Sequence, residues 1–261
     1  MPTPPTGHDE LAVLLRDAGA AAQECFGRAR TRRKRDGTVV TEADLAAEAI
    51  LVEGLRARWP DDGLCGEEGA SKEAGPGEDS GTWYIDPIDG TASYVEGLAY
   101  WGSAVARVDS AGIEVGAFYL PRLDELWFAR RGQGAWRAGE RLPTLEGEEP
   151  GRHGVIYLPS RFHQWGRVDY PGKTRNLGSI AAHLCLVAGG AAEGTFIPPG
   201  WRQWDVLAGL LLLEEVGGVA LKLDGTPLRP LEDSREPFVA GTEPACRFLL
   251  GPRGIRARQS P

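Results

Sequence analysis

The chain has 261 residues, of which 42% are hydrophobic and 25% charged, and its formal net charge at pH 7 is −8. This composition is typical of a globular protein, and the acidic balance argues against a nucleic-acid-binding surface, which needs a basic face. The one dense basic run, residues 28–35, is interpreted as a solvated helix end and loop.

Cysteine usage and the N-terminal segment predict a cytoplasmic protein. The four scattered cysteines, which form no C-x-x-C pair, are Cys25, Cys65, Cys185 and Cys246. Free thiols in a reducing compartment are therefore expected. The first residues lack the basic and apolar regions of a signal peptide. The longest apolar run, 206–213, is interrupted by Gly209 and is too short to cross a bilayer, so no membrane partner is expected.

Two amphipathic helices are predicted at the start of the chain. Apolar residues recur at helical spacing over residues 9–28. A second helix is expected to begin at Thr41, an N-cap whose capping-box partner is Asp44. This helix is expected to end at Trp59-Pro60, where proline cannot continue it.

Two short strands follow, and each leads into acidic residues. The first, 63–67, runs into Glu68, and the second, 83–85, ends at Asp86. The segment between them, 71–81, is rich in Gly, Ser and Glu and is predicted to be a mobile loop.

Short strands separated by turn signals predict an antiparallel meander in the middle of the chain. The predicted strands are 103–108, 114–119, 126–129 and 135–137. The stretch 139–152 is rich in Gly, Pro and Glu and makes the best internal boundary. We therefore expect an N-terminal half, 1–150, and a C-terminal half, 151–261.

Strands and helices alternate in the second half. The predicted strands are 153–158, 192–196, a hairpin over 219–228 that turns at Asp224-Gly225, and 238–240, and the predicted helices are 179–187, 204–215 and 243–250. Sheets interleaved with helices predict an α/β or α+β fold with alternating helix and sheet layers, an αβαβα sandwich.

The hexapeptide from Asp86 to Thr91 is the first candidate site. Its two carboxylates, on Asp86 and Asp89, lie three residues apart on a turn that a proline and a glycine favour. Such a turn can direct both carboxylates and the Ile88 carbonyl at one hard cation, Mg²⁺ above all. The amides of Gly90 and Thr91 suit a phosphate oxygen. Taken alone, the hexapeptide is equally compatible with a surface turn closed by an Asx hydrogen bond.

Two further acidic segments have structural explanations of their own. Glu67 and Glu68 close a predicted strand; adjacent glutamates are normally just solvated, but their place before the next carboxylate strand favours a functional role. Asp205 falls in the first turn of an apolar helix, where an aspartate commonly caps the helix or stabilises its dipole.

Together, these segments resemble the signature of the inositol monophosphatase family. Glu-Glu at 67–68, Asp-Pro-Ile-Asp-Gly-Thr at 86–91 and Trp-Asp-Val-x-Ala-Gly at 204–209 occur in that family's order. The resemblance extends to 39–44, to Gly178-Ser179 and to 214–218, and it covers nearly the whole chain. It is specific for the superfamily and only weakly specific for the substrate.

The resemblance implies a Mg²⁺-dependent phosphomonoesterase that hydrolyses a small phosphorylated metabolite by a metal-activated water. It also implies two or three Mg²⁺ ions and a homodimer. The implied metal ligands are Glu67, Asp86, the Ile88 carbonyl, Asp89 and Asp205.

The same resemblance assigns the remaining roles around the phosphate. Asp44 and Thr91 resemble the pair that orients and deprotonates the attacking water. Glu67 is implied to hold a third, weaker ion through waters, and the amides of Gly90 and Thr91 to hold the phosphate.

The chain departs from the family pattern in several places. Thr38 stands where the family often has an acid, and Lys34 competes with Arg33 and Arg35 for the place of its upstream basic residue. Residues 93–97 read Ser-Tyr-Val-Glu-Gly in place of Asn-Phe-x-x-Gly.

The segment before Trp204 bears on the substrate. Inositol monophosphatases carry a glutamate there that holds sugar hydroxyls, but residues 196–203 contain no acid, which argues against inositol phosphate itself. The candidate substrate residues are Glu68, Ser179, Arg175, Arg202 and Gln203, with Arg161 and Lys173 as further candidates.

Three alternatives are weighed against this interpretation. Other phosphatases of the superfamily, for histidinol phosphate, a sugar bisphosphate, 3′-phosphoadenosine phosphate or NADP, stay open. A non-catalytic metal- or phosphate-binding regulator is less favoured, because the acidic set is intact. Aspartyl-phosphate phosphatases are disfavoured, because their two aspartates lie two residues apart and here the spacing is three.

Overall fold

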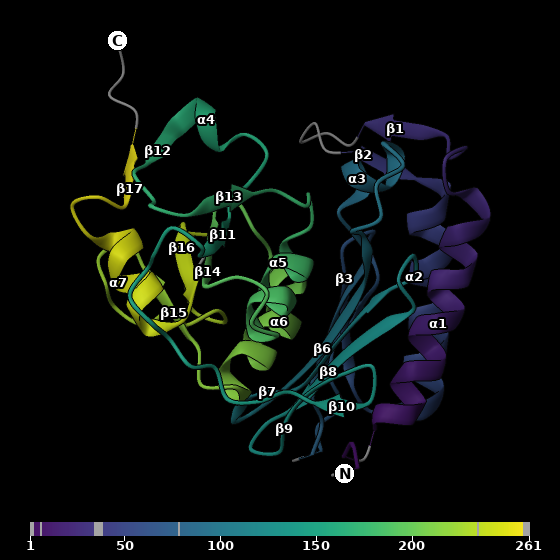
Figure 1. The fold of residues 1–261 in the computed structure, drawn as a ribbon. Helices are drawn as coiled ribbons and strands as arrows, with labels where there is room; N and C mark the ends of the chain where they lie inside the picture. Colours follow the sequence, from purple (N-terminus) through teal and green to yellow (C-terminus); the bar gives the residue numbers. More distant parts are fainter. Residues whose placement is uncertain (1–2, 6, 34–38, 78, 234, 258–261) are drawn as a thin grey trace.

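Helices α1 (His8–Cys25) and α2 (Glu42–Arg58) form the first layer of the fold (Figure 1). The computed structural model describes residues 3–257 except 6, 34–38, 78 and 234. Helix α1 buries Leu11, Leu15 and Ala18, which recur at helical spacing on one face. Both helices pack through a shared apolar cluster against one face of a large sheet.

The large sheet has eight strands in the order β10-β9-β8-β7-β6-β5-β3-β4. Their bounds are β3 Gly63–Gly66, β4 Ser71–Lys72, β5 Thr82–Asp89, β6 Gly102–Asp109, β7 Gly112–Leu120, β8 Glu125–Arg130, β9 Gly134–Arg137 and β10 Glu140–Arg141. Strands β3 and β5 pair in parallel, and the run from β5 to β10 is antiparallel, as the predicted meander requires. The predicted loop 71–81 begins with strand β4, which pairs with β3, so that expectation is wrong at its start.

Helices α5 (Ile180–Ala188) and α6 (Gln203–Glu215) form the third layer. Every residue of α6 from Val206 to Leu213 is buried, because the helix lies between two sheets. At Gly209 an added Cβ would lie 2.4 Å from the Cβ of Leu184, so the glycine permits α5 and α6 to approach closely. The apolar run that is too short to cross a membrane is therefore a central core helix.

A second sheet and a final helix complete the layers. The sheet has the order β13-β11-β14-β16-β15, with β11 Val155–Tyr157, β13 Lys173–Arg175, β14 Gly194–Ile197, β15 Val219–Lys222 and β16 Phe238–Gly241. Helix α7 (Glu243–Leu250) packs on its outer face through Cys246 and Leu249. The order helix, sheet, helix, sheet, helix in Figure 1 confirms the predicted layered fold.

Several short elements were not expected from the sequence. They are β1 (Thr31–Arg33) paired with β2 (Val39–Thr41), α4 (Phe162–Trp165), and β12 (Gly166–Val168) paired with β17 (Ile255–Ala257). The turn after Asp86 leads into the short helix α3 (Thr91–Val95). The predicted hairpin over 219–228 is present: the Lys222 and Leu228 amides donate to the Thr226 and Ala220 carbonyls, the Gly225 amide donates to the Lys222 carbonyl, and β15 also pairs with β16. No helix among the described residues combines the length and apolar character needed to span a bilayer.

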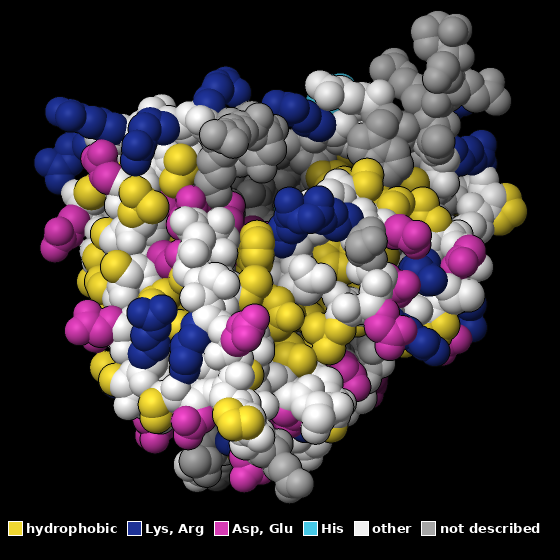
Figure 2. Space-filling model, turned by 180° about the vertical axis from the view of Figure 1, so that it is seen from behind, with side chains coloured by type: hydrophobic (Ala, Val, Ile, Leu, Met, Phe, Trp, Pro, Cys, Tyr) yellow, Lys and Arg dark blue, Asp and Glu magenta, His cyan; other side chains and the backbone are white. Residues whose placement is uncertain are grey.

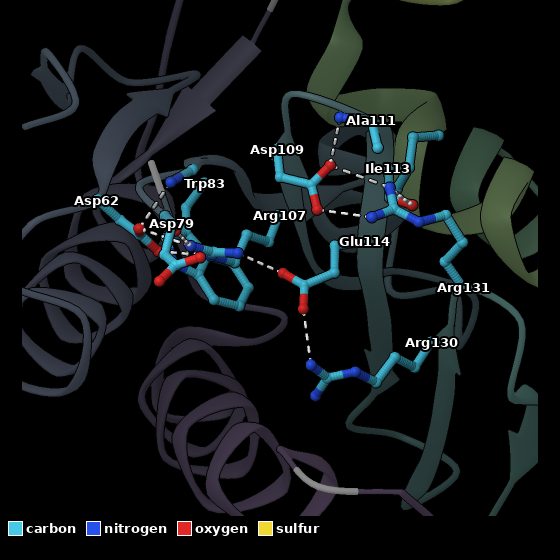
Figure 3. A network of polar contacts seen from close by, with 11 residues as sticks. Asp62, Asp79, Trp83, Arg107, Asp109, Ala111, Ile113, Glu114, Arg130 and Arg131 are labelled. Carbon is cyan, nitrogen blue, oxygen red and sulfur yellow. Dashed lines mark hydrogen bonds and ion pairs between the residues drawn. The ribbon is translucent and has the colours of Figure 1, made fainter. Parts of the chain in front are cut away.

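A network of charged residues lies on the large sheet beside the start of β5 (Figure 3). Asp62 accepts hydrogen bonds from the Gly81 amide, from Trp83 Nε1 at 2.8 Å and from Arg107 Nε at 2.7 Å. Arg107 also donates to Glu114, which accepts a second bond from Arg130 at 2.7 Å. Burial opposes ionisation of Asp62, but the bonds from Arg107, Gly81 and Trp83 outweigh it, and its pKa is lowered.

The surface carries both signs of charge. On the face in Figure 2, acidic, basic and hydrophobic side chains are interspersed. The four cysteines are free thiols, as expected.

Candidate active site

The predicted turn at Asp86 is the distal end of strand β5. The β5–β6 register shifts between Asp86 and Asp89, as in a β-bulge. Within this stretch, the Ser103 hydroxyl donates a hydrogen bond to the Pro87 carbonyl oxygen at 2.7 Å. Asp86 and Asp89 are only 2% and 7% exposed, so this is not the solvated surface turn of the structural alternative. The bulge therefore sets two buried carboxylates at one end of the strand.

Gly90 is required by two features of this turn. Its φ is +90°, in the left-handed region that side chains disfavour. An added Cβ would also lie 3.1 Å from the Ser179 Cβ and 3.2 Å from the Gly178 carbonyl oxygen. Thr91 then begins α3, whose amides follow directly after the carboxylates.

Helix α2 delivers Asp44 to the same turn. The capping box is present, with Asp44 Oδ2 accepting from the Thr41 amide at 2.7 Å and from the Thr41 hydroxyl at 2.6 Å. Thr91 Oγ1 lies 3.2 Å from Asp44 Oδ1 and 3.1 Å from the Ile88 carbonyl oxygen. The structure thus brings together Asp44 and Thr91, which are 47 residues apart in sequence.

Glu67 reaches the site from the parallel neighbour of β5. Its amide donates to the Ile85 carbonyl at 3.1 Å, which continues the β3–β5 pairing by one residue. After burial, its charge is the largest cause of the raised pKa of Asp86, so the two carboxyl groups lie close together.

Glu48, which no sequence motif singled out, fixes the turn that carries Glu67. Glu48 is 7% exposed, and its two carboxylate oxygens accept from the amides of Glu68 at 2.7 Å and Ala70 at 2.9 Å. The available signal was its position four residues after Asp44, on the same face of α2.

The C-terminal part of the chain contributes from two helix starts. Ser179 is the N-cap of α5, and its hydroxyl donates to Asp89 Oδ2, which also accepts from the Ala181 amide at 2.7 Å. Asp205, in the first turn of α6, accepts from the Arg202 amide at 2.7 Å. Asp89 therefore joins the end of β5 to the start of α5.

The acidic side chains of this site share one electrostatic environment. Burial, followed by the charges of Glu67, Asp89 and Asp205, raises the pKa of Asp86. Burial also raises the pKa of Asp89 to about 6, and burial with the Asp89 charge raises the pKa of Asp205 to about 8. Burial is likewise the main cause of the raised pKa of Asp44.

The donor set fits a hard divalent cation by its chemistry. Among the described residues, no Lys or Arg side chain forms an ion pair with Asp86, Asp89 or Asp205. Carboxylates buried without a cationic partner are costly, and oxygen ligands of this kind suit Mg²⁺. As placed, however, no three His, Cys, Asp or Glu side chains within the described residues form a group that could hold a metal ion. The carboxylates are electrostatically coupled but do not form a closed coordination shell.

The predicted substrate residues differ in their relation to this cluster. Ser179 contacts Asp89 directly, and Glu68 lies on the turn that Glu48 holds. Arg202 and Gln203 lie at the start of α6, close before Asp205. Three basic candidates are exposed and are not drawn into the cluster: Arg161, Lys173 and Arg175. Thr38 and Lys34 lie outside the described residues.

Comparison with known proteins identifies the family. The model of the inositol monophosphatase family matches residues 9–246. The chain belongs to the inositol monophosphatase family. The predicted family, and with it a phosphatase of a small phosphorylated substrate, is confirmed.

The similar proteins of this family are named for different substrates. The chain is 33% identical over 227 residues to a histidinol-phosphatase of Chlorobaculum parvum, covering 83% of this chain and 86% of the relative. It is 32% identical over 254 residues to a fructose-1,6-bisphosphatase/inositol-1-monophosphatase of Aquifex aeolicus, covering 92% of each. Its fold is similar to the IMPase of Thermotoga maritima, with a TM-score of 0.78 and 27% identity over 90% of this chain and 92% of that one.

Proposed function

We propose that the chain is a Mg²⁺-dependent phosphomonoesterase in which a metal-activated water attacks the phosphate of a small metabolite. One observation carries this proposal: buried carboxylates from β5 and α6 are coupled to one another, and no Lys or Arg among the described residues pairs with Asp86, Asp89 or Asp205. Membership of a phosphatase family supplies the reaction class.

The residues that would hold two or three Mg²⁺ ions are Glu67, Asp86, the Ile88 carbonyl, Asp89 and Asp205. When bound, the ions supply a water of lowered pKa and neutralise charge on the phosphate and leaving oxygens. The protein contributes the preorganised positions of these oxygens, since Asp86, Asp89 and Asp205 each accept at least one backbone amide.

Asp44 and Thr91 are proposed to orient the attacking water and to take its proton. The Thr91 hydroxyl lies within hydrogen-bonding distance of Asp44, so a water held by Thr91 has a carboxylate behind it to receive the proton. The water oxygen forms the new P–O bond, the ester P–O bond breaks, and the leaving alkoxide takes a proton from solvent. The amides of Gly90 and Thr91 are proposed to bind a phosphate oxygen.

The alcohol part of the substrate is not set by these residues. Candidates are inositol phosphate, histidinol phosphate, a sugar bisphosphate, 3′-phosphoadenosine phosphate and NADP. The substrate names of the relatives include three of these classes. A non-catalytic regulator is less favoured, because every acid of the proposed set is present.

We also propose a cytoplasmic homodimer without nucleic-acid or membrane partners. In each protomer, residues 1–150 would carry most metal ligands, and residues 151–261 would carry Asp205 and the segment before Trp204 that bears on the substrate.

A phosphate-release screen tests the proposed function. Purified protein is incubated with the candidate esters in Mg²⁺ or in EDTA, and a Li⁺ arm tests for the inhibition that the family resemblance implies. The expected result is release from at least one ester that depends on Mg²⁺. Release that persists in EDTA, or no release from the whole panel, would contradict the proposal.

A further inference from the structure

A cavity of about 150 Å³ lies beside the proposed phosphate site. Ser179 belongs to both, because it lines the cavity and its hydroxyl donates to Asp89. Gly178 also lines the cavity, and its carbonyl lies 3.2 Å from the position of an added Gly90 Cβ. The cavity is therefore next to the turn that would hold the phosphate, on the side of the C-terminal sheet.

The residues that line this cavity are all uncharged. The apolar wall includes Ile180, Phe196 and Pro198, and the polar groups are Ser160, Asn176 and His183. An ammonium or a second phosphate placed here would meet no opposite charge in the lining. The lining therefore disfavours a charged group inside the cavity.

His183 is held as a neutral ring in this wall. It is 3% exposed and stacks face to face on Tyr157, with ring centroids 4.8 Å apart and planes 2° from parallel. Its Nε2 accepts from the Leu177 amide at 3.0 Å, which assigns the ring proton to Nδ1. Burial lowers the pKa of His183 to about 3, so the ring stays uncharged at working pH.

The other polar groups form a short neutral edge. Asn176 donates to the Ser160 hydroxyl at 2.6 Å, and its side-chain oxygen accepts from the Gly178 amide at 2.7 Å. The cavity therefore has a largely apolar lining with few hydrogen-bonding groups. A polyol placed here would leave several hydroxyls without partners, whereas a flat ring with one or two polar edges would not.

The volume also favours a single ring. An apolar cavity of about 150 Å³ engineered in another protein binds benzene, so the volume here matches that of one small ring. That space is sufficient for an imidazole or a pyrimidine ring.

We infer that this cavity receives an uncharged heterocyclic ring carried by the substrate alcohol, so the enzyme prefers ring-bearing phosphate monoesters to polyol phosphates. The inference rests on the proposed function, since the phosphate would lie at Asp89 and Thr91. Two sources share this ring chemistry: the imidazole of histidinol phosphate, whose ammonium would stay outside the cavity, and the base of a pyrimidine nucleoside 3′-monophosphate.

Variants of Ser160 test the inference, because this residue is exposed and lies outside the proposed catalytic set. Ser160→Phe places a bulky ring at the edge of the cavity, and Ser160→Ala is the matched control that removes only the hydroxyl. Values of kcat/KM are measured for histidinol phosphate, cytidine 3′-monophosphate and inositol 1-phosphate. Inhibition by inorganic phosphate reports on the phosphate site, and a melting curve reports on folding.

Wild-type protein is expected to favour at least one ring-bearing ester over inositol 1-phosphate by about 10-fold or more. Ser160→Phe is expected to lower that kcat/KM by about 10-fold, a magnitude typical of losing a well-fitted group from a pocket. Ser160→Phe should lower the kcat/KM for inositol 1-phosphate by a smaller factor, and inhibition by inorganic phosphate should be retained. Which ester responds separates the imidazole from the pyrimidine source.

Binding of the free alcohols gives a readout that does not need turnover. Saturation-transfer NMR with cytidine and histidinol should show contact at the ring protons in the wild type and in Ser160→Ala, and loss of that contact in Ser160→Phe. Hydrolysis that favours inositol 1-phosphate, or ring contact that survives in a folded Ser160→Phe, would overturn the inference. If ring contact follows the expected pattern but no ester is hydrolysed, the cavity assignment stands and the proposed function fails.

Discussion

Buried carboxylates beside the two ends of strand β5 lie in opposite electrostatic settings. Next to its start, Asp62, which precedes β3, is paired with Arg107 in the network of Figure 3, and its pKa is lowered. At its far end, Asp86 and Asp89 face other acids, and both pKa values are raised. The first arrangement is electrostatically complete within the protein, whereas the second becomes stable only when protons or cations are added. Raised pKa values of clustered acids are typical of functional sites.

Replacing one acid at the far end should have the largest effect on activity. Asp89→Asn keeps an oxygen that can accept from Ser179 and the Ala181 amide, so the fold should persist. It removes one charge of the proposed cation site, and we expect phosphate release to fall by about 1,000-fold. The measurement is kcat with saturating Mg²⁺.

Asp9→Asn is a suitable control, because the Asp9 side chain is 98% exposed in α1. Activity within a factor of two in the control and a near-normal kcat in Asp89→Asn would remove Asp89 from the catalytic set.

Replacing the acid at the near end should affect stability instead. Asp62→Asn leaves Arg107, whose side chain is 13% exposed, without its main partner. Breaking a buried pair in this way costs about 3 kcal/mol of unfolding free energy. Urea unfolding measures the loss, and kcat of the protein that remains folded should be close to wild type. A stability equal to that of the Asp9→Asn control would show that the network is not needed for the fold.

The metal-free protein should lose stability as the pH rises from about 4 to about 8. The folded pKa values of Asp89, about 6, and Asp205, about 8, lie above the ordinary value of 3.8. In this window the folded state binds more protons than the unfolded state, so unfolding becomes easier as pH increases. Melting temperatures in EDTA measure the effect.

At lower pH, Asp62 at the near end should make the stability change in the opposite direction, so that stability rises with pH. The depressed pKa of Asp62 contributes stability that is lost as pH falls below 3.8. Asp205→Asn should flatten the slope between pH 4 and 8 and leave the acid limb unchanged. If the melting temperature changes with pH equally in Asp205→Asn and wild type, Asp205 does not belong to the group of acids with raised pKa values.

Glu48 should have the smallest effect and acts on the position of Glu67. Glu48→Gln keeps one acceptor for the amides of Glu68 and Ala70 and loses the other. We expect the half-saturating Mg²⁺ concentration to rise about 10-fold, as is common when a group behind a metal ligand is altered. Glu53→Gln, on the exposed side of the same helix, is the matched control. A lowered melting temperature with unchanged Mg²⁺ dependence would make Glu48 purely structural.

Local features of the site could be predicted from the sequence. The Thr41–Asp44 capping box depends only on residues within one helical turn, and it is present as expected. The turn after Asp86 is likewise set by neighbouring residues, Pro87 and Gly90. Its burial and its carboxylate partners come from other layers of the fold.

Contacts between distant segments could not be predicted in the same way. Arg107 meets Asp62 because β6 pairs with β5 in a register that places Arg107 opposite Trp83. Ser179 meets Asp89 across 90 residues, since α5 begins where β5 ends. Neither contact has a periodic signature, because register and packing between layers decide them.

The response of the melting temperature to Mg²⁺ tests the central contrast most directly. The carboxylates at the far end of β5 are predicted to be destabilising until cations bind, so Mg²⁺ at about 100 times its dissociation constant should add about 2.7 kcal/mol for each site. For a chain of this size, that corresponds to a rise of about 5–10 °C per site. Wild-type protein should show this rise at pH 8, and Asp89→Asn should show much less. An equal melting temperature in Mg²⁺ and EDTA would contradict a cation site at this end of the strand.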